Sequence, residues 1–322
     1  MKKTVHAALA CAALAAATAL AQPGFPSRTV TLTVGFAPGG GTDTAARIVA
    51  KKLTEDIGQS VVVENRAGAG GNIAAQHIAN ATPDGYTISL SSVGPLSVSP
   101  SLYKSLPYDP KRDIAPLTMG VVFPNVFVVN PSVPARTLKE FVALAKSKPG
   151  ELNYASSGVG GAGHLAGELF KQAAGIDLVH VPYKGGGPAM TDLLGGRVTM
   201  YPAVPSTALP HIQAGKVFAL AVTGPDRLPT MPGVPTVAES GYPGFEAMNW
   251  YAFVAPAKTP PEILDYWNRE LVKVLKDPGV RAALMRDGLD PKPGTREELA
   301  RYIERETEKW ARVVREAKIQ PE

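Results

Sequence analysis

A glycine-rich loop is the first segment of this chain whose residue types could bind a ligand. It consists of Pro38, Gly39, Gly40, Gly41, Thr42 and Asp43, between an apolar segment (29–36) and a helical one (42–57). Glycines let backbone N–H groups approach a ligand, and the N-terminal end of a helix favours an anion. Thr42 is the expected N-cap residue. The loop predicts a site for a carboxylate or another small anion, although a purely structural turn has the same composition.

A nucleotide is the competing ligand for glycine-rich loops. The first loop lacks the Gly-Lys-Ser/Thr ending that a phosphate-binding loop requires. Residues 158–163 do fit the G-x-G-x-x-G pattern, and Asp177 follows at about the right distance for a ribose-binding acid. However, Asp177 precedes the strand predicted at 178–182 instead of ending it. A carboxylate or similar anion is therefore favoured over a dinucleotide.

Polar side chains around this second loop could also contact an anion. Ser156, Ser157, Gly158 and His164 offer hydroxyl, backbone and imidazole donors, and His164 could equally cap a helix. Two further segments contribute candidates, each with a structural alternative. Lys184 could offer a charge at the cleft or be a solvent-facing loop residue. Trp250 and Tyr251 could form an apolar wall for the ligand or pack at the hinge.

Patterns for catalysis and metal binding are missing from the sequence. Ser157 lies in Ala-Ser-Ser-Gly, which is not the G-x-S-x-G of a nucleophile elbow. The histidines occur singly, without an H-E-x-x-H arrangement. We therefore expect no catalytic activity, no metal and no cofactor.

The N-terminal segment has the features of an export signal. Lys2 and Lys3 precede an apolar run at 5–20, and Ala19-Leu20-Ala21 is a small-x-small cleavage site. The run is shorter than the roughly 20 residues of a membrane-spanning helix, and Pro23 follows at once. The sequence predicts a signal peptide at 1–21 and a mature protein in the periplasm. Cys11, the single cysteine, would leave with the signal unless it accepts a lipid.

The charge distribution does not suggest a nucleic-acid partner. The chain has 33 Lys and Arg against 28 Asp and Glu, a net charge of +5 at pH 7. A nucleic-acid site needs basic residues concentrated on one face, but here they mostly lie beside acids, as at 301–305. A mixed, solvated surface is expected.

The elements that must position these residues alternate between strand and helix, which predicts parallel β-sheets covered by helices. Expected strands are 29–36, 60–64, 86–90, 152–155, 178–182 and 217–222, and expected helices are 42–57, 72–79, 138–147, 164–174 and 188–194. Capping boxes are predicted for Thr137 with Glu140, Thr259 with Glu262 and Thr295 with Glu298. Ile263, Leu264, Trp267, Leu271 and Val274 would form one apolar helix face.

A chain of about 300 mature residues exceeds the size at which a single core usually stops growing. Two α/β lobes are therefore expected, lobe I from 27–126 plus 252–322 and lobe II from 127–251. The crossing segments 126–129 and 251–254 are expected to run side by side as hinge strands, which would permit lobe closure.

Several motifs along the chain occur together in one known family. They are Phe36-Ala37-Pro38-Gly39-Gly40-Gly41-Thr42-Asp43, Val63-Glu64-Asn65-Arg66, Gly68-Ala69-Gly70-Gly71-Asn72, Pro83-Asp84-Gly85-Tyr86 and Val181-Pro182-Tyr183-Lys184-Gly185. The chain thus resembles the Bug receptors, the solute-binding proteins of tripartite tricarboxylate transporters, over essentially its whole mature length.

The resemblance implies a Venus-flytrap fold of the type II periplasmic binding protein kind. It implies a receptor that captures a small organic carboxylate, a di- or tricarboxylate or an aromatic acid, for membrane permease subunits. By position, residues 38–43 with Ser91 and Ser92 would hold one carboxylate, and Ser156, Ser157, Gly158, His164 and Ser206 would line the same cleft. A monomer is expected. A ligand-sensing module and an exported enzyme remain the alternatives.

The sequence departs from many relatives at two places. Ala162 and Gly163 stand where relatives carry Ser or Thr, and Pro202 and Ala203 stand where they often carry an acidic or amide group. Fewer polar groups predict a less polar ligand end, such as that of an aromatic or long-chain acid.

Overall fold

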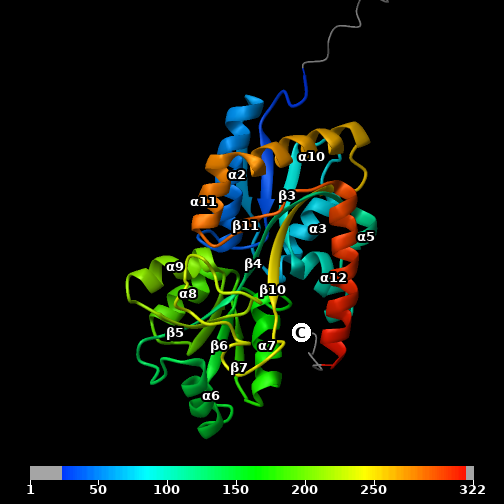
Figure 1. The fold of residues 1–322 in the computed structure, drawn as a ribbon. Coiled ribbons are helices and arrows are strands. Elements are labelled where there is room, and N and C mark those ends of the chain that lie inside the picture. The colour runs from blue at the N-terminus through cyan, green and yellow to red at the C-terminus, as the bar shows by residue number, and fades with distance from the viewer. Residues whose placement is uncertain (1–23, 317–322) are drawn as a thin grey trace, which may run out of the picture.

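The computed structural model describes residues 24–316, which form two lobes, each built on one β-sheet with helices on both faces (Figure 1). The predicted signal peptide at 1–21 lies outside the described residues. The two-lobed α/β class predicted from the sequence is confirmed.

The first lobe contains a six-stranded sheet in the order β11-β4-β10-β3-β1-β2. Strands β1, β2 and β3 are parallel, whereas β10 is antiparallel to its neighbours β3 and β4. The strands are β1 (Val30–Val34), β2 (Val61–Asn65), β3 (Thr87–Ser92), β4 (Ile114–Pro124), β10 (Met248–Pro256) and β11 (Asp290–Pro291). The helical elements are α2 (Gly41–Ile57), η1 (Ala69–Gly71), α3 (Asn72–Asn80), η2 (Gly94–Val98), α4 (Ser99–Leu102), α5 (Pro110–Asp113), α10 (Pro261–Lys276), α11 (Pro278–Arg286) and α12 (Arg296–Glu316).

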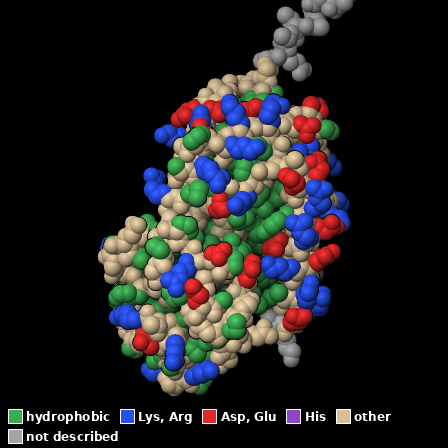
Figure 2. Space-filling model, in the orientation of Figure 1, with side chains coloured by type: hydrophobic (Ala, Val, Ile, Leu, Met, Phe, Trp, Pro, Cys, Tyr) green, Lys and Arg blue, Asp and Glu red, His purple; other side chains and the backbone are tan. Residues whose placement is uncertain are grey.

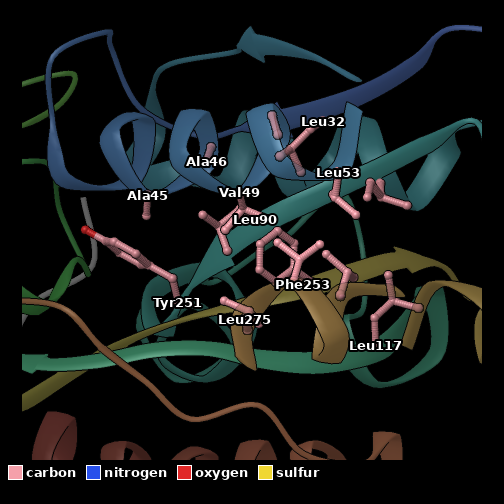
Figure 3. Packing of buried hydrophobic residues seen from close by; sticks show 14 of the residues in the cluster. Leu32, Ala45, Ala46, Val49, Leu53, Leu90, Leu117, Tyr251, Phe253 and Leu275 are labelled. Carbon is pink, nitrogen blue, oxygen red and sulfur yellow. The ribbon is translucent and has the colours of Figure 1, made fainter. Parts of the chain in front are cut away.

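Apolar side chains cover both faces of this sheet. On one face, Leu32, Leu90 and Phe253 from the strands pack against Val49 and Leu53 of α2 (Figure 3). Burying each such side chain contributes roughly 1.5–3 kcal/mol. Helices α10 and α11 join the same core, while α3, η2, α4 and α12 cover the other face.

The apolar stripe predicted on α10 is confirmed. Leu264, Trp267, Leu271 and Val274 are buried in the first core, and Ile263 is partly buried against it. Their spacing of three and four residues puts them on one helix face. None of the described helices is both long enough and apolar enough to cross a membrane.

The second lobe contains a five-stranded sheet in the order β7-β6-β8-β5-β9. Helices α6 and α7 cover one face, and α8 and α9 cover the other. The elements are β5 (Val126–Val129), α6 (Leu138–Ser147), β6 (Asn153–Ser156), α7 (Ala162–Ala174), β7 (Val179–Pro182), α8 (Gly186–Leu194), β8 (Met200–Ala203), α9 (Pro205–Gln213) and β9 (Phe218–Val222).

The chain crosses between the lobes at two places, and the strands there differ from the expectation. Segments 126–129 and 251–254 belong to different sheets, because β5 pairs with β8 and β9 while β10 pairs with β3 and β4. The segments that do run side by side are the end of β4 and the start of β10, where Met248 is opposite Pro124. Residues 248–251 thus belong to the first sheet, not to the second lobe as expected.

Thr223 ties the two crossings together. Its hydroxyl accepts a hydrogen bond from the Asn125 N–H at 2.8 Å and donates to the Ala247 carbonyl at 2.7 Å. The Thr223 N–H in turn donates to the Asn125 carbonyl at 2.9 Å. The hinge is therefore a hydrogen-bonded unit of limited freedom.

Two of the three predicted capping boxes are present. Thr137 with Glu140 and Thr295 with Glu298 each exchange both hydrogen bonds. The third prediction is wrong, because Pro260 is the N-cap of α10 and the Thr259 hydroxyl has no partner among the described atoms. On the face shown in Figure 2, positive and negative side chains are intermixed, including along α12.

Candidate functional site

A small cavity of about 30 Å³ lies between the lobes, at the carboxyl ends of parallel strands β1, β3, β6 and β8. Ligands of open α/β sheets bind at this edge. The lining residues are Phe36, Gly40, Gly41, Thr42, Ser92, Asn125, Ser157, Gly161, Ala162, Gly163, Gly186, Val204, Asn249 and Tyr251.

Four helices begin at this cavity. Their N-cap residues are Gly40 for α2, Gly161 for α7, Gly185 for α8 and Val204 for α9, and none of them makes a side-chain capping hydrogen bond. The first N–H groups of a helix lack partners within the helix, and the aligned peptide dipoles place partial positive charge there. None of the lining residues carries a charged side chain. The cavity therefore attracts an anion through helix ends instead of through ionic groups.

The lobes are in direct contact around the cavity. The Ala37 N–H donates a hydrogen bond across the gap to the Lys184 carbonyl at 3.0 Å. A Cβ atom added at Gly41 would lie 2.4 Å from the Val204 side chain, and one added at Gly40 would lie 3.3 Å from the Gly186 nitrogen. Contacts this close need glycine, so the glycines permit a closed arrangement.

Hydroxyl groups complete the first-lobe wall. The Thr42 and Tyr251 hydroxyls are hydrogen-bonded to each other, and burial raises the pKa of Tyr251. Figure 3 shows the Tyr251 hydroxyl pointing out of the apolar core near the start of α2. Thr42 lies within the first turn of α2 and is not the N-cap that the sequence predicts. Its hydroxyl is thereby free to face the cavity instead of the helix backbone.

The second lobe contributes a matching hydroxyl pair. The Ser157 Oγ lies 3.1 Å from the Tyr201 hydroxyl oxygen. Burial raises the pKa of Tyr201 to about 12, so this phenol keeps its proton at neutral pH. Both walls therefore present neutral hydroxyl donors.

Comparison with known proteins decides the family. Residues 45–319 match the family model described as the tripartite tricarboxylate transporter family receptor. The chain belongs to this receptor family.

Relatives and solved structures agree with the family match over nearly the whole chain. The protein BugT of Bordetella pertussis is 41% identical over 293 residues, covering 91% of this chain and 90% of BugT. The structure of R. palustris Rpa4515 with adipate is 37% identical with a TM-score of 0.90, covering 92% of this chain and all of that one. MatC from Rhodopseudomonas palustris with bound malate is 33% identical with a TM-score of 0.86, covering 90% and 100%. The resemblance stated from the motifs is confirmed.

In this receptor, six of the candidate residues from the sequence line the cavity, namely Gly40, Gly41, Thr42, Ser92, Ser157 and Tyr251. Pro38 and Gly39 are exposed at the rim, and Lys184 is exposed and contributes its carbonyl to the lobe contact. Ser91 is buried next to Ser92 but is not part of the lining, and Ser206 lies behind Gly41 at the start of α9.

Asp43 of the receptor folds the glycine loop and does not face the ligand space. Its carboxylate accepts hydrogen bonds from the Gly39 N–H, from Arg47 and from Asn65. Burial raises the pKa of Asp43, but these hydrogen bonds and the Arg47 charge outweigh burial, and its pKa lies below the usual value. The ionised Asp43 carboxylate therefore fixes the conformation of the loop through these hydrogen bonds.

Ser156, Gly158 and His164 support the second loop from behind. The Ser156 Oγ lies 2.6 Å from Nε2 of His180, and it accepts a hydrogen bond from the Gly158 N–H at 3.1 Å. The Gly160 N–H donates to Nδ1 of His164, and the two imidazole rings stack with centroids 4.2 Å apart. These residues fix the backbone that carries Ser157 and Gly161 to the cavity.

The structure does not bring Trp250 to the cavity. Successive residues of a strand point to opposite faces, so Tyr251 reaches the cavity while Trp250 points into the core under α12. Its indole N–H donates to Glu306 at 3.1 Å. The sequence pattern could place both residues on one strand, but not decide which faced the ligand.

Several lining residues were missed by the sequence argument, above all Asn125, Gly186, Val204 and Asn249. Asn125 had a usable signal, since it is a single polar residue between the apolar runs 121–123 and 126–129.

The two places where the sequence departs from many relatives, 162–163 and 202–203, are in contact in the structure. A Cβ atom on Gly163 would lie 2.8 Å from the Pro202 carbonyl oxygen, so glycine lets α7 pack against β8.

Metal ligands do not cluster in this receptor. Among residues 24–316, no group of three or more His, Cys, Asp or Glu side chains is arranged to hold a metal ion.

Proposed function

We propose that this receptor captures a small organic carboxylate between its lobes and delivers it to the membrane permease subunits of a tripartite transporter. The observation that supports the carboxylate most directly is the convergence of four uncapped helix N-termini on a cavity without charged lining residues. Neutral donors suit a carrier that must release its ligand, because charged clamps bind anions more tightly.

The solved relatives give independent support. Adipate is bound in Rpa4515, and malate is bound in MatC. Both ligands are dicarboxylates, and both proteins share the fold of this chain along its length. A di- or tricarboxylate, or an aromatic acid, is the ligand class that we propose here.

The mature receptor would be a periplasmic monomer that begins near Gln22, after removal of the signal peptide. Residues 27–124 with 248–316 and residues 126–247 would move as two lobes about the hinge at Asn125 and Thr223. It would carry out no chemical step on its ligand.

Thermal unfolding of the mature, ligand-free protein against mono-, di- and tricarboxylates, aliphatic and aromatic, tests this function. A ligand at 100 times its dissociation constant adds about 2.7 kcal/mol, which raises the unfolding midpoint by roughly 5 °C or more. We expect such a shift with one class of acid. No shift with any acid would contradict the proposal, and conversion of the acid during long incubation, detected by mass spectrometry, would instead indicate an enzyme.

A variant pair tests the site. Gly40→Val places a branched side chain against Gly186 of the other lobe, so affinity should fall about tenfold or more. Gly233→Val is the matched control, because a Cβ atom there meets nothing within 4 Å. Equal affinity of the two variants for the acid found above would contradict the assignment of this cavity.

A further inference from the structure

The loop at residues 157–161 of the second lobe takes part in two contacts of the closed receptor. Its first and last residues, Ser157 and Gly161, line the cavity. Between them the loop touches the first lobe, because a Cβ atom on Gly158 would lie 3.0 Å from Gly70 Cα. The ligand cavity and the contact between the lobes therefore both depend on one conformation of this loop.

A single imidazole holds the middle of the loop. The Gly160 N–H donates a hydrogen bond to Nδ1 of His164 at 3.2 Å, and both residues are buried. Nδ1 can accept this bond only while it carries no proton. A proton on Nδ1 would place two donors against each other and leave both without an acceptor, which is costly for buried groups. The loop conformation therefore requires a neutral His164.

A second imidazole lies directly against the first. The rings of His164 and His180 stack with centroids 4.2 Å apart, and His180 in turn stacks on Tyr154 at 4.9 Å. Nε2 of His180 lies 2.6 Å from Oγ of Ser156, and that oxygen accepts the Gly158 N–H. Two neutral rings pack well at this distance, whereas a charge on either ring would be poorly solvated between its neighbours. The cluster behind the loop suits the neutral form of both histidines.

The other titratable groups around the pair do not compensate a proton on His164. Glu168, one turn further along α7, favours the charged imidazole, but its carboxylate is bonded to the Tyr154 hydroxyl at 2.6 Å and to Lys171 at 2.9 Å. Lys171 opposes a charge on either imidazole. From the first lobe, Tyr103 lies beside the loop, and its phenol is uncharged at neutral pH. Burial is the largest influence and lowers the pKa of His164 to about 4.

We propose that His164 is a positioning residue for ligand binding: its neutral imidazole holds the loop in the form that lines the cavity, and its protonation releases the loop and the ligand. The inference rests on the proposed function and adds a proton dependence to it. In the released loop the ring meets water, and its pKa returns toward about 6.5. Affinity is therefore complete above about pH 6.5 and falls as the pH falls below that value.

Nuclear magnetic resonance of the ligand-free receptor tests the loop directly. Isotope-labelled glycine and histidine report the amide groups of Gly158 and Gly160 and the ring of His164 as the pH is lowered from about 7.5 to about 4. The two glycine signals should change with the same midpoint as the ring, while the glycines of the first lobe keep their folded positions. A ring that titrates without a change at the two glycines would overturn the inference. So would a ring that stays neutral until the whole protein unfolds.

Calorimetric titration with malate and adipate, the acids bound in the two solved relatives, tests the effect on binding. For the acid that binds, affinity should fall about tenfold more between pH 7.5 and pH 5 in the unchanged receptor than in His164→Gln. Glutamine can accept the Gly160 N–H but does not titrate, and comparing two proteins cancels the protons that the acid itself takes up. Equal pH profiles would overturn the inference. If neither acid binds at pH 7.5, the result counts against the proposed ligand class, and the resonance titration, which needs no ligand, decides the inference.

Two more variants separate positioning from a general structural role. His164→Leu has no acceptor for Gly160, so its affinity should be about tenfold below that of His164→Gln at both pH values. His211→Gln removes a partly exposed histidine of the same lobe and should keep the pH profile of the unchanged receptor. A flattened profile in His211→Gln, or equal affinity of the two His164 variants, would overturn the role of this residue. Should His164→Leu not fold, His164→Gln and the resonance titration decide the question.

Discussion

The Ala37 N–H donates to the Lys184 carbonyl across the gap between the lobes, at 3.0 Å. One partner follows β1 of the first sheet and the other follows β7 of the second. The bond can form only when the lobes are closed, and it lies beside the glycine contacts that surround the cavity. The closed arrangement therefore depends on contacts between backbone atoms of the two lobes. Side chains added to the facing glycines should oppose it.

Gly41→Ala should weaken ligand binding by about tenfold or more. The added methyl would lie 2.4 Å from Val204 Cγ1 of the other lobe, so the lobes could not close fully. Val204→Ala in the same protein should restore part of the affinity, because it removes Cγ1 but leaves the Val204 Cβ at 2.9 Å and the Ser206 Oγ at 3.0 Å. Calorimetry with the single and double variants measures both effects, and a double variant as weak as Gly41→Ala would show that Gly41 acts in another way.

The variants Tyr251→Phe and Trp250→Phe should have different effects on ligand affinity, because the two side chains lie on opposite faces of β10. Loss of the Tyr251 hydroxyl removes the partner of Thr42 and should lower ligand affinity several-fold, since a net hydrogen bond contributes about 1 kcal/mol. Trp250→Phe should leave affinity within about twofold, because the indole faces α12. The measurement is the dissociation constant for the same acid, and the reverse order of effects would place the ligand on the other face.

Glu306→Ala should destabilise the first lobe by about 2–4 kcal/mol. The Glu306 Oε2 accepts hydrogen bonds from the Trp250 and Trp310 indoles at 3.1 and 2.9 Å. Without it, two buried N–H donors lose their acceptor, and each costs about 1–3 kcal/mol. Urea unfolding followed by tryptophan fluorescence measures the loss. Glu308→Ala, on the exposed side of α12, is the control and should change stability by less than about 0.5 kcal/mol.

The buried histidine pair predicts a pH dependence of stability. Burial lowers the pKa of His164 to about 4 and that of His180 to about 3, against about 6.5 in the unfolded chain. The unfolded state therefore binds more protons at mildly acidic pH. The stability that these neutral imidazoles provide is complete above pH 6.5 and is lost as the pH falls below it. Glu168 and Lys171, which also act on His164, have opposite effects on its pKa.

His164→Gln should make this dependence shallower. Glutamine can accept the Gly160 N–H bond but does not titrate, so the difference in unfolding free energy between pH 7.5 and pH 5 should shrink by about 2 kcal/mol. Urea unfolding at the two pH values is the measurement. An unchanged pH dependence in the variant would mean that His164 is already protonated, or exposed, in the folded protein.

Local features of the fold could be predicted from the sequence, and long-range pairings could not. The Thr137 capping box needs only residues three apart, and the sequence is sufficient to predict it. The Thr259 box failed because Pro260 itself took the N-cap position. The partnership of β4 with β10 joins residues more than a hundred positions apart, and no short-range pattern encodes it.

For the site as well, the contiguous part could be predicted from the sequence, and the part assembled by the tertiary fold could not. The glycine loop at 39–42 is contiguous and carries its own signal for anion binding. The cavity as a whole needs Asn125 from a crossing, Val204 from the start of α9 and Gly186 from the start of α8. Single residues like these become a site only when four helix ends meet, which is a property of the tertiary fold.

The close contact between the two lobes should also affect how long a ligand stays bound. A ligand enclosed on both sides has no exit until the Ala37–Lys184 bond breaks and the glycine surfaces separate. The residence time of the complex is then governed by the rate of lobe opening, and variants at Gly40 and Gly41 should shorten it while the association rate changes little. A permease that pulls the lobes apart would release the ligand without any change in the chemistry that holds it.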